Sequence, residues 1–257
     1  MSDVSPATRR VDVLGVPITP CTVDEAVERV ADWIRDDRRA FATFTGVHGI
    51  MESQRDPQVM DAHRAAALVA CDGAPMVWAS RWAGVEIQNR VTGRDFMLAC
   101  TARAAREGWT SFFYGGKPGV ADALADSLRE RFPALQVAGT FTPPFGATTA
   151  DEDEQMVAAI NASNADLVWV GLSTPKQELW MADHRDRLRA SALFGVGAAF
   201  DFLTGEVREA PRWMQRAGFE WLFRMVSEPR RLARRYLQNN PAFIRAIAMN
   251  PPRLHHP

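Results

Sequence analysis

Short apolar runs alternate with longer stretches of helical periodicity along most of the chain, and this alternation limits the fold more than any other feature. Runs that are apolar throughout, rather than alternately apolar and polar, are typical of parallel strands buried on both faces. We therefore predict an α/β fold, with a mostly parallel, Rossmann-like sheet covered by helices on both faces. The expected strands are residues 40–45, 68–71, 111–114, 135–139, 166–171 and 192–196, after a small hairpin at 11–18.

The character of the sequence changes after Gly205. Residues 206–257 show no strand pattern and carry ten arginines against four glutamates, although the whole chain of 257 residues has a formal net charge of -1. We predict two units, an α/β domain at 1–205 and an arginine-rich helical appendage at 206–257, whose helical stretches are interrupted by prolines. Such a basic segment favours an anionic membrane surface or a phosphate-rich ligand as its partner.

The cysteines and the apolar runs indicate the cellular compartment. Cys21, Cys71 and Cys100 are odd in number and have no CxxC spacing, which is typical of a protein of the reducing cytosol. The N-terminus has no apolar run of the signal-peptide kind, and the longest apolar stretch is interrupted by Asp72. We expect a cytoplasmic protein that can lie on a membrane without crossing it.

Ligands of open α/β sheets bind at the carboxyl ends of the strands, so polar residues that follow the expected strands are candidates for a site. The hydroxyl of Thr45 can approach a phosphate or a sugar, although the segment taken alone is more typical of a plain strand-to-helix turn. Asp72 can act as the general base for a sugar hydroxyl, or form a turn with Gly73. Arg90, in the segment RVTGRD, can bind a pyrophosphate, or lie in a solvated loop.

Two later turns also suit a phosphate ligand. The segment that contains Gly115 and Gly116 lacks the GK[ST] spacing of a nucleoside triphosphatase, but its glycines can bring the backbone close to a phosphate. In the segment GLSTPKQE, Thr174 and Gln177 have the spacing of a capping box. That arrangement leaves Lys176 or Gln177 facing a nucleotide.

Two further segments imitate cofactor or metal motifs. The segment GVGAAF nearly spells the dinucleotide fingerprint, but Phe200 replaces its third glycine and the segment is expected at the end of the sheet. Asp151 and Asp153 resemble a DxD metal motif, yet acidic residues are favoured at the start of a helix. The five histidines have no zinc spacing. We therefore expect neither a cofactor nor a metal.

The motifs, taken in order, resemble the WecG/TagA/CpsF family of bacterial glycosyltransferases (glycosyltransferase family 26). The resemblance runs from about Val11 to Phe243. It rests on DG after the third apolar run, RVxGxD, GGxPGVA, GLxxPKQExW, GVGxxFDFxxG and a closing EWxxRxxxEPxRLxxRY. Many members have a T-x-N pattern after the second strand, where this chain has Thr45-Gly46-Val47.

The resemblance implies inverting, metal-independent transfer of a sugar from a UDP-sugar to a polyprenyl-diphosphate-linked acceptor, in cell-surface polysaccharide synthesis. The sugar would be N-acetylmannosamine, its uronic acid or a related hexose. By position, Asp72 matches the family's proposed base, and Thr45 and Arg90 lie in its motifs. The residues expected to bind the donor are Gly115, Gly116, Lys176, Gln177 and Asp201. The tail would close the site and meet the inner face of the membrane, with Arg224, Arg231 and Arg235 at phosphates or head groups.

Two other classes of function are open to the sequence. A nicotinamide-dependent oxidoreductase would need the intact fingerprint. A nucleic-acid-binding module would rest on the basic tail alone, whose Trp213, Trp221 and Tyr236 are spaced as in an amphipathic packing face. We expect no nucleic-acid partner, and the sequence leaves a homo-oligomer open.

Overall fold

The computed structural model describes residues 9–87, 89–144, 146, 148–207, 210–211, 213–214 and 220–255. Its centre is a six-stranded sheet in the order β4-β3-β8-β7-β5-β6, in which every pair of strands is parallel. The strands are β3 (Ala40–Thr45), β4 (Leu68–Cys71), β5 (Thr110–Gly115), β6 (Gln136–Phe141), β7 (Leu167–Gly171) and β8 (Ala192–Gly195). The predicted α/β fold with a Rossmann-like parallel sheet is confirmed.

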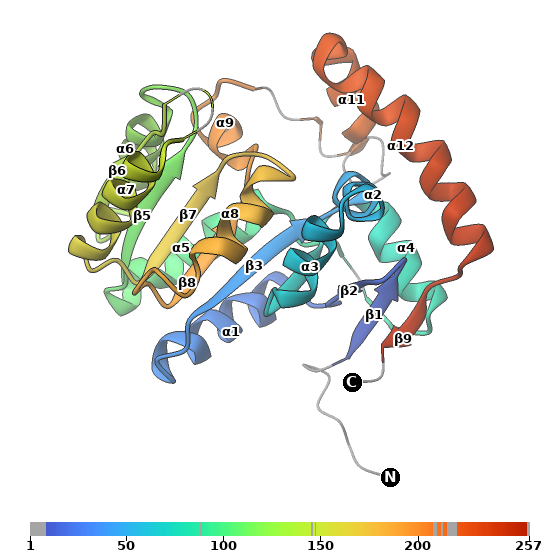
Figure 1. Ribbon diagram of the computed structural model, residues 1–257, viewed down its shortest axis with the longest axis horizontal. Coiled ribbons are helices and arrows are strands. Elements are labelled where there is room, and N and C mark those ends of the chain that lie inside the picture. The colour runs from blue at the N-terminus through green and yellow to red at the C-terminus, as the bar shows by residue number, and fades with distance from the viewer. Residues whose placement is uncertain are drawn as a thin grey trace.

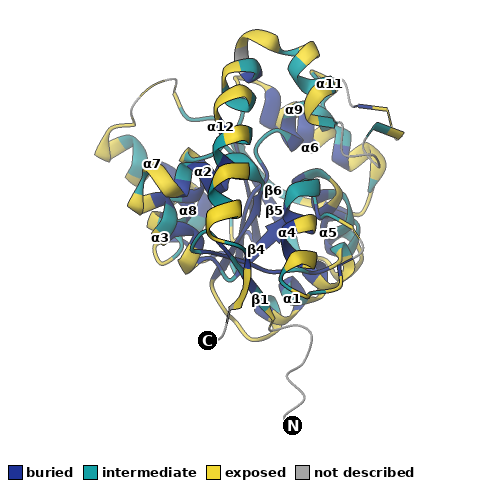
Figure 2. Cartoon of the chain, turned by 90° about the vertical axis from the view of Figure 1, so that its right-hand side faces the viewer, coloured by how far each residue is buried: buried dark blue, intermediate teal, exposed yellow. Residues whose placement is uncertain are grey.

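Helices cover both faces of this sheet (Figures 1 and 2). In β7, Leu167 and Trp169 belong to the core on one face, and Val168 and Val170 to the core on the other. Successive side chains of a strand point to opposite faces, so a fully apolar strand needs cover on both sides. The first face carries α1 (Val23–Arg35), α5 (Gly93–Glu107), α6 (Val120–Arg131) and α9 (Ala199–Leu203). The second carries α2 (Val47–Arg55), α3 (Pro57–Ala65), α4 (Ala74–Trp82), α7 (Ala150–Ala162) and α8 (Lys176–His184).

The order of the strands reverses at β3. From β3 the chain continues to the edge strand β4, and then crosses to β5, which lies beyond β8 and β7. The prediction that the segment after β8 lies at the end of the sheet is wrong, because β8 pairs with β3 on one side and β7 on the other. A reversal of this kind opens a crevice at the carboxyl ends of the strands.

The end of the chain returns to its beginning (Figure 1). A small antiparallel sheet joins β2 (Val16–Ile18), β1 (Arg10–Val13) and β9 (Arg253–His255), with Leu254 opposite Val11. The prediction that residues 206–257 contain no strand is therefore wrong. Three residues are too few to show an alternating pattern, and β9 forms because the edge of β1 supplies its hydrogen-bond partners.

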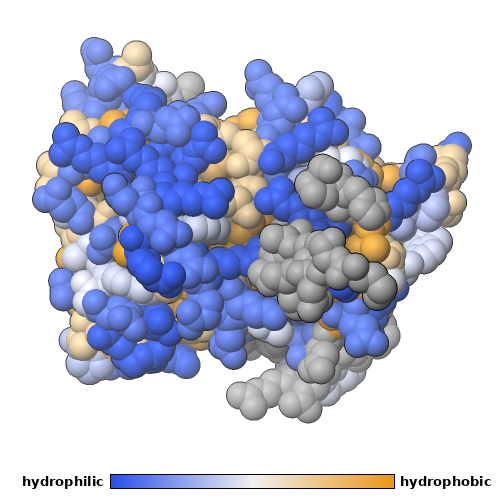
Figure 3. Space-filling model, turned by 90° about the horizontal axis from the view of Figure 1, so that it is seen from below, coloured by the Kyte–Doolittle hydropathy of each residue, from blue (hydrophilic) through white to orange (hydrophobic). Residues whose placement is uncertain are grey.

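Most of the described residues of the tail are helical, in α11 (Glu220–Ser227) and α12 (Pro229–Met249). Pro229 begins α12, but Pro241 lies inside it rather than interrupting it. No helix in the described part of the chain is both long and apolar enough to cross a membrane. The face seen in Figure 3 is mostly hydrophilic, with hydrophobic residues in limited areas. The domain boundary at Gly205 stays a prediction.

A buried polar network fastens the end of β3 to α3. The hydroxyl of Thr45 lies 2.9 Å from His63 Nε2 and 3.2 Å from Thr43 Oγ1. On the other side of the ring, His63 Nδ1 lies 3.0 Å from both the carbonyl oxygen of Val59 and the hydroxyl of Ser53. Because a carbonyl oxygen can only accept, the proton of His63 belongs on Nδ1, and Nε2 accepts from Thr45. Burial lowers the pKa of His63 to about 4, so the ring is neutral at neutral pH.

We expect His63 to make the stability of the protein depend on pH. Its pKa is about 4 in the folded protein against 6.5 for an unperturbed histidine, so the stability it supports is present above pH 6.5 and is lost as the pH falls toward 4. His63→Asn should reduce the drop in unfolding free energy between pH 7 and pH 5 by about 2 kcal/mol, measured by urea titration. His48, whose pKa is also lowered to about 4, is present in both proteins and cancels from the comparison. An identical drop in both proteins would contradict this account.

Candidate active site

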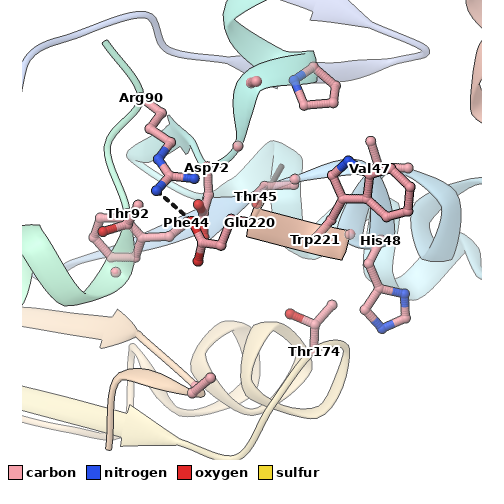
Figure 4. A pocket seen from close by; sticks show the side chains of 18 of the residues that line it. Phe44, Thr45, Val47, His48, Asp72, Arg90, Thr92, Thr174, Glu220 and Trp221 are labelled. Carbon is pink, nitrogen blue, oxygen red and sulfur yellow. Dashed lines mark ion pairs between the residues drawn. The ribbon is translucent and has the colours of Figure 1, made fainter. Parts of the chain in front are cut away.

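A pocket of about 720 Å³ opens at the carboxyl ends of β3, β4 and β8, and its walls come from distant parts of the chain (Figure 4). The polar and charged side chains that line it are Thr45, His48, Asp72, Thr92, Arg90, Arg94, Asp95, Ser173, Thr174, Gln177, Glu220, Arg224, Arg235, Tyr236, Asn239 and Asn240. The predicted catalytic residues Thr45, Asp72 and Arg90 therefore share one pocket with arginines of the tail.

Asp72 lies where β4 ends, and the strand pairing holds it in place. Its backbone N–H donates to the carbonyl oxygen of Thr45 at 3.0 Å. A Cβ on Gly46 would lie only 2.7 Å from the carbonyl oxygen of Asp72, so the close approach of the two turns requires a glycine there. Burial, with a smaller contribution from the charge of Glu220, raises the pKa of Asp72 to about 7, although Arg90 and Arg224 oppose the shift. A carboxyl group with a pKa near 7 can both take up and release a proton at neutral pH.

Arg90 is held beside Asp72 by the loop that leads into α5. The N–H of Val91 donates to the carbonyl oxygen of Cys71 at 2.8 Å, which fastens this loop to the end of β4. Thr92 then caps α5, its hydroxyl accepting from the N–H of Asp95 at 3.1 Å. The guanidinium of Arg90 forms an ion pair with Glu220, 2.5 Å between Nη2 and Oε2. The RVTGRD segment therefore brings a cation to the candidate base.

The tail supplies two more arginines to the same pocket, Arg224 from α11 and Arg235 from α12. The guanidinium of Arg224 lies 5.2 Å from the ring centre of Phe202, and that of Arg235 lies 5.3 Å from that of Tyr236. The Nε atoms of both arginines are buried and have no hydrogen-bond partner among the described residues. The side chain of Arg231 lies outside the described residues. Arg224 and Arg235 thus offer N–H groups to an anion in the pocket.

Of the predicted donor-binding residues, Gln177 lines the pocket. The hydrogen bond that holds its side chain there was not indicated by the sequence. The predicted capping box is wrong: Pro175 occupies the N-cap of α8, and Thr174 donates to Glu178 Oε1 at 2.9 Å. Gln177 Nε2 instead donates to the carbonyl oxygen of Gly195 at 2.9 Å, because β8 lies beside α8. The residue is only 3% exposed, and its Oε1 has no hydrogen-bond partner in the described structure. That oxygen can accept a hydrogen bond from a ligand.

The other predicted donor-binding residues are not in the lining of this pocket; they are Gly115, Gly116, Lys176 and Asp201. Packing accounts for the two glycines. A Cβ on Gly115 would lie 2.8 Å from the backbone of Gly171, and one on Gly116 would lie 3.0 Å from the side chain of Val120. A role of these four residues in donor binding stays a prediction.

Thr45 lines the pocket, but its hydroxyl is already used in the network with His63 and Thr43. The Thr45 side chain therefore has a structural role, because its hydrogen bonds hold the end of β3 in place. A catalytic role for Thr45 stays a prediction.

The pocket also has apolar lining residues that the sequence analysis did not single out. Trp78 and Trp82 of α4 are 59% and 58% exposed, and they line the pocket together with Ile244 and Ile247 of α12. The two tryptophans are four residues apart, which places them on one face of a helix. That spacing was the available signal, whereas the contribution of α12 to the lining follows from the tertiary structure alone. The sequence analysis also missed Glu220.

Asp153, in the acidic first turn of α7, has structural partners. Its Oδ1 lies 2.8 Å from His184 Nε2 and its Oδ2 accepts from Arg187 Nη1 at 2.7 Å, and it does not line the pocket. Among the described residues, no group of three or more His, Cys, Asp or Glu side chains is placed to hold a metal ion. That the reaction needs no metal stays a prediction.

Residues 11–256 match the model of the glycosyl transferase WecG/TagA/CpsF family, which is nearly the whole chain. This is the family that the order of the motifs resembles. The chain therefore belongs to the WecG/TagA/CpsF family of glycosyltransferases.

Proposed function

We propose that this glycosyltransferase transfers a sugar from a UDP-sugar to a polyprenyl-diphosphate-linked acceptor, with inversion, without a metal ion and with Asp72 as the general base. The sugar is N-acetylmannosamine, its uronic acid or a related hexose, and the product serves cell-surface polysaccharide synthesis. The observation that carries the proposal is the position of Asp72, a carboxyl group with a pKa near 7 among arginines in the pocket at the strand ends. The alternative of a nicotinamide-dependent oxidoreductase gains nothing from the family match.

In the proposed reaction, the acceptor hydroxyl attacks the anomeric carbon of the donor sugar. Asp72 takes the proton of this hydroxyl as the new carbon–oxygen bond forms, and the bond from the anomeric carbon to the diphosphate breaks. UDP leaves with the electron pair and its additional negative charge. Because the base and the leaving group lie on opposite sides of the anomeric carbon, the configuration at that carbon inverts.

The arginines of the pocket support the binding of the diphosphate. A guanidinium group presents N–H donors in a planar fork that matches phosphate oxygens. Arg90, Arg224 and Arg235 converge on the pocket from the core and the tail. Fixed positive groups of this kind stabilise the charge that develops on a leaving group.

The apolar lining of the pocket supports a lipid-linked acceptor. Trp78, Trp82, Ile244 and Ile247 line the same pocket as Asp72. An acceptor with a diphosphate beside an isoprenoid chain is both charged and apolar, and the pocket has both characters. The isoprenoid chain contributes binding free energy through the apolar area that it buries.

The outer side of α12 supports attachment to the inner face of an anionic membrane. Arg230 and Arg234 are exposed there, as are Leu237 and Met249. A helix with basic and apolar residues on its exposed side can lie in the head-group region of a lipid bilayer. The proposed location is cytoplasmic, with peripheral binding to the membrane that contains the acceptor.

Asp72→Asn should lower kcat by about 10²–10⁴, the usual effect of removing a positioned base. Binding of UDP, measured by calorimetry, should change little. Near-normal turnover by the variant, followed as UDP release, would remove Asp72 from the mechanism.

In the unaltered enzyme, kcat/KM should fall about tenfold per pH unit below pH 7, because the base must be ionised to accept a proton.

Excess EDTA should leave the rate essentially unchanged, because arginines rather than a metal ion are proposed to stabilise the diphosphate. The rate of UDP release is measured before and after chelation. A loss of activity that Mg²⁺ or Mn²⁺ restores would contradict metal independence.

Replacing both Trp78 and Trp82 by alanine should raise KM for a long-chain polyprenyl acceptor about tenfold, through loss of apolar contact. KM for an acceptor with a short, water-soluble chain should change much less. Trp213→Ala is the matched control, because Trp213 is 65% exposed and does not line the pocket. Equal effects on both acceptors would argue against a lipid-binding role.

Replacing Arg230 and Arg234 by glutamine should weaken binding to anionic vesicles by roughly tenfold or more, since each basic residue at such a surface contributes about 1 kcal/mol. Co-sedimentation with vesicles of defined anionic lipid content measures the effect. The control replaces Arg129 and Arg131 of α6, which is the same change of charge away from α12. Equal losses in both double variants would contradict attachment through α12.

A further inference from the structure

Glu220, the first residue of α11, reaches across the pocket to Arg90. Its Oε2 lies 2.5 Å from Arg90 Nη2, and the two side chains are 25% and 19% exposed, respectively. Figure 4 shows this ion pair beside Asp72. A carboxylate of the C-terminal segment is thus bound to an arginine of the α/β core.

The position of α11 makes this contact important. The helix has no buried residue and packs chiefly on α12, where Trp221 meets Tyr236 with ring centres 5.9 Å apart. Its contacts with the α/β core include the pair of Glu220 with Arg90, and Arg224 against Phe202. An ion pair therefore contributes directly to holding α11 over the pocket.

The charges around Glu220 favour displacement of its carboxylate from Arg90 by an anion of higher charge. Among the described residues, the charged groups that line the pocket are Arg90, Arg94, Arg224, Arg235, Asp72, Asp95 and Glu220. Glu220 and Asp72 are two carboxyl groups beside one arginine, and like charges at this range repel. Oε2 of Glu220 is buried and meets no described donor in hydrogen-bond geometry, in spite of its short distance to Arg90. The pair is therefore close but imperfectly formed.

We propose that the Glu220 carboxylate holds the position on Arg90 that a diphosphate group takes when a ligand binds. The inference rests on the proposed function, which supplies the diphosphate. A diphosphate carries more negative charge and more acceptor oxygens than a carboxylate, so it competes well for the guanidinium fork.

Arg224 remains in place to contact the incoming group. It lies four residues after Glu220, and side chains with this spacing share one face of a helix. Its buried Nε has no hydrogen-bond partner among the described residues. Binding thus exchanges an internal carboxylate for an external diphosphate on Arg90, while the next turn of α11 contributes a second arginine.

Calorimetry with inorganic pyrophosphate and with UDP tests the exchange in the full-length protein. Glu220→Gln keeps the shape of the side chain and removes its charge. We expect this variant to bind pyrophosphate about three- to tenfold more tightly than the unaltered protein, the range for loss of a half-buried competing ion pair. Glu107→Gln is the matched control, because it removes an ion pair of 2.9 Å with Arg103 outside the pocket. This control variant should bind pyrophosphate with the affinity of the unaltered protein. Glu220→Asp, which keeps the charge but shortens the reach, should gain less.

A double-mutant cycle assigns the effect to Arg90. In an Arg90→Gln background, Glu220→Gln should add little, because the position for which the carboxylate competes is gone. Equal or weaker pyrophosphate binding by Glu220→Gln overturns the inference, as does a full gain that persists without Arg90. Absence of pyrophosphate binding in both the unaltered protein and Glu220→Gln also overturns it. A gain in affinity for pyrophosphate, with UDP bound no more tightly than pyrophosphate, supports the inference and contradicts the UDP-sugar function.

Discussion

The parallel pairing of β3 with β4 on one side and with β8 on the other is the constraint on which the whole site depends. In this register Thr45 lies opposite Cys71, so the next residue along β4, Asp72, emerges beside the end of β3. Because all six strands run the same way, their carboxyl ends meet at one edge of the sheet. A Cβ at Gly46 would collide with the backbone of Asp72, so this alignment also depends on one glycine.

The electrostatics of the pocket follow from this geometry. A carboxyl group buried at the end of a strand has lost part of its hydration, which raises its pKa. The loop that carries Arg90 is fastened to the same strand, so a cation lies beside the group that needs one. Glu220 forms an ion pair with that cation, and its charge adds to the rise in the pKa of Asp72. Three side chains from distant segments thus act as one charged unit.

The tail reaches the pocket because several separate contacts hold it on the core. β9 pairs with β1, and Phe243 of α12 is buried in the core on the second face of the sheet. Asn239 of α12 accepts from Arg55 Nη2 at 2.5 Å, and its Nδ2 lies 3.1 Å from His48 Nδ1. These contacts place α12 across the open end of the crevice. Removing the whole tail would therefore take away part of the packing as well as the arginines.

The sequence by itself determined the features that local energies decide. The apolar runs predicted every strand of the large sheet, and Asp72 was expected directly after one of them. Thr22 and Glu25 form a capping box at the start of α1, which depends on residues close together in the sequence. Only the tertiary structure decided which distant groups meet. It put β8 at the centre, paired β9 with β1, and brought Glu220 to Arg90. The physical reason is that a helix cap or an apolar strand depends on neighbours within a few residues, whereas strand order and ion pairs between segments depend on how the whole chain packs.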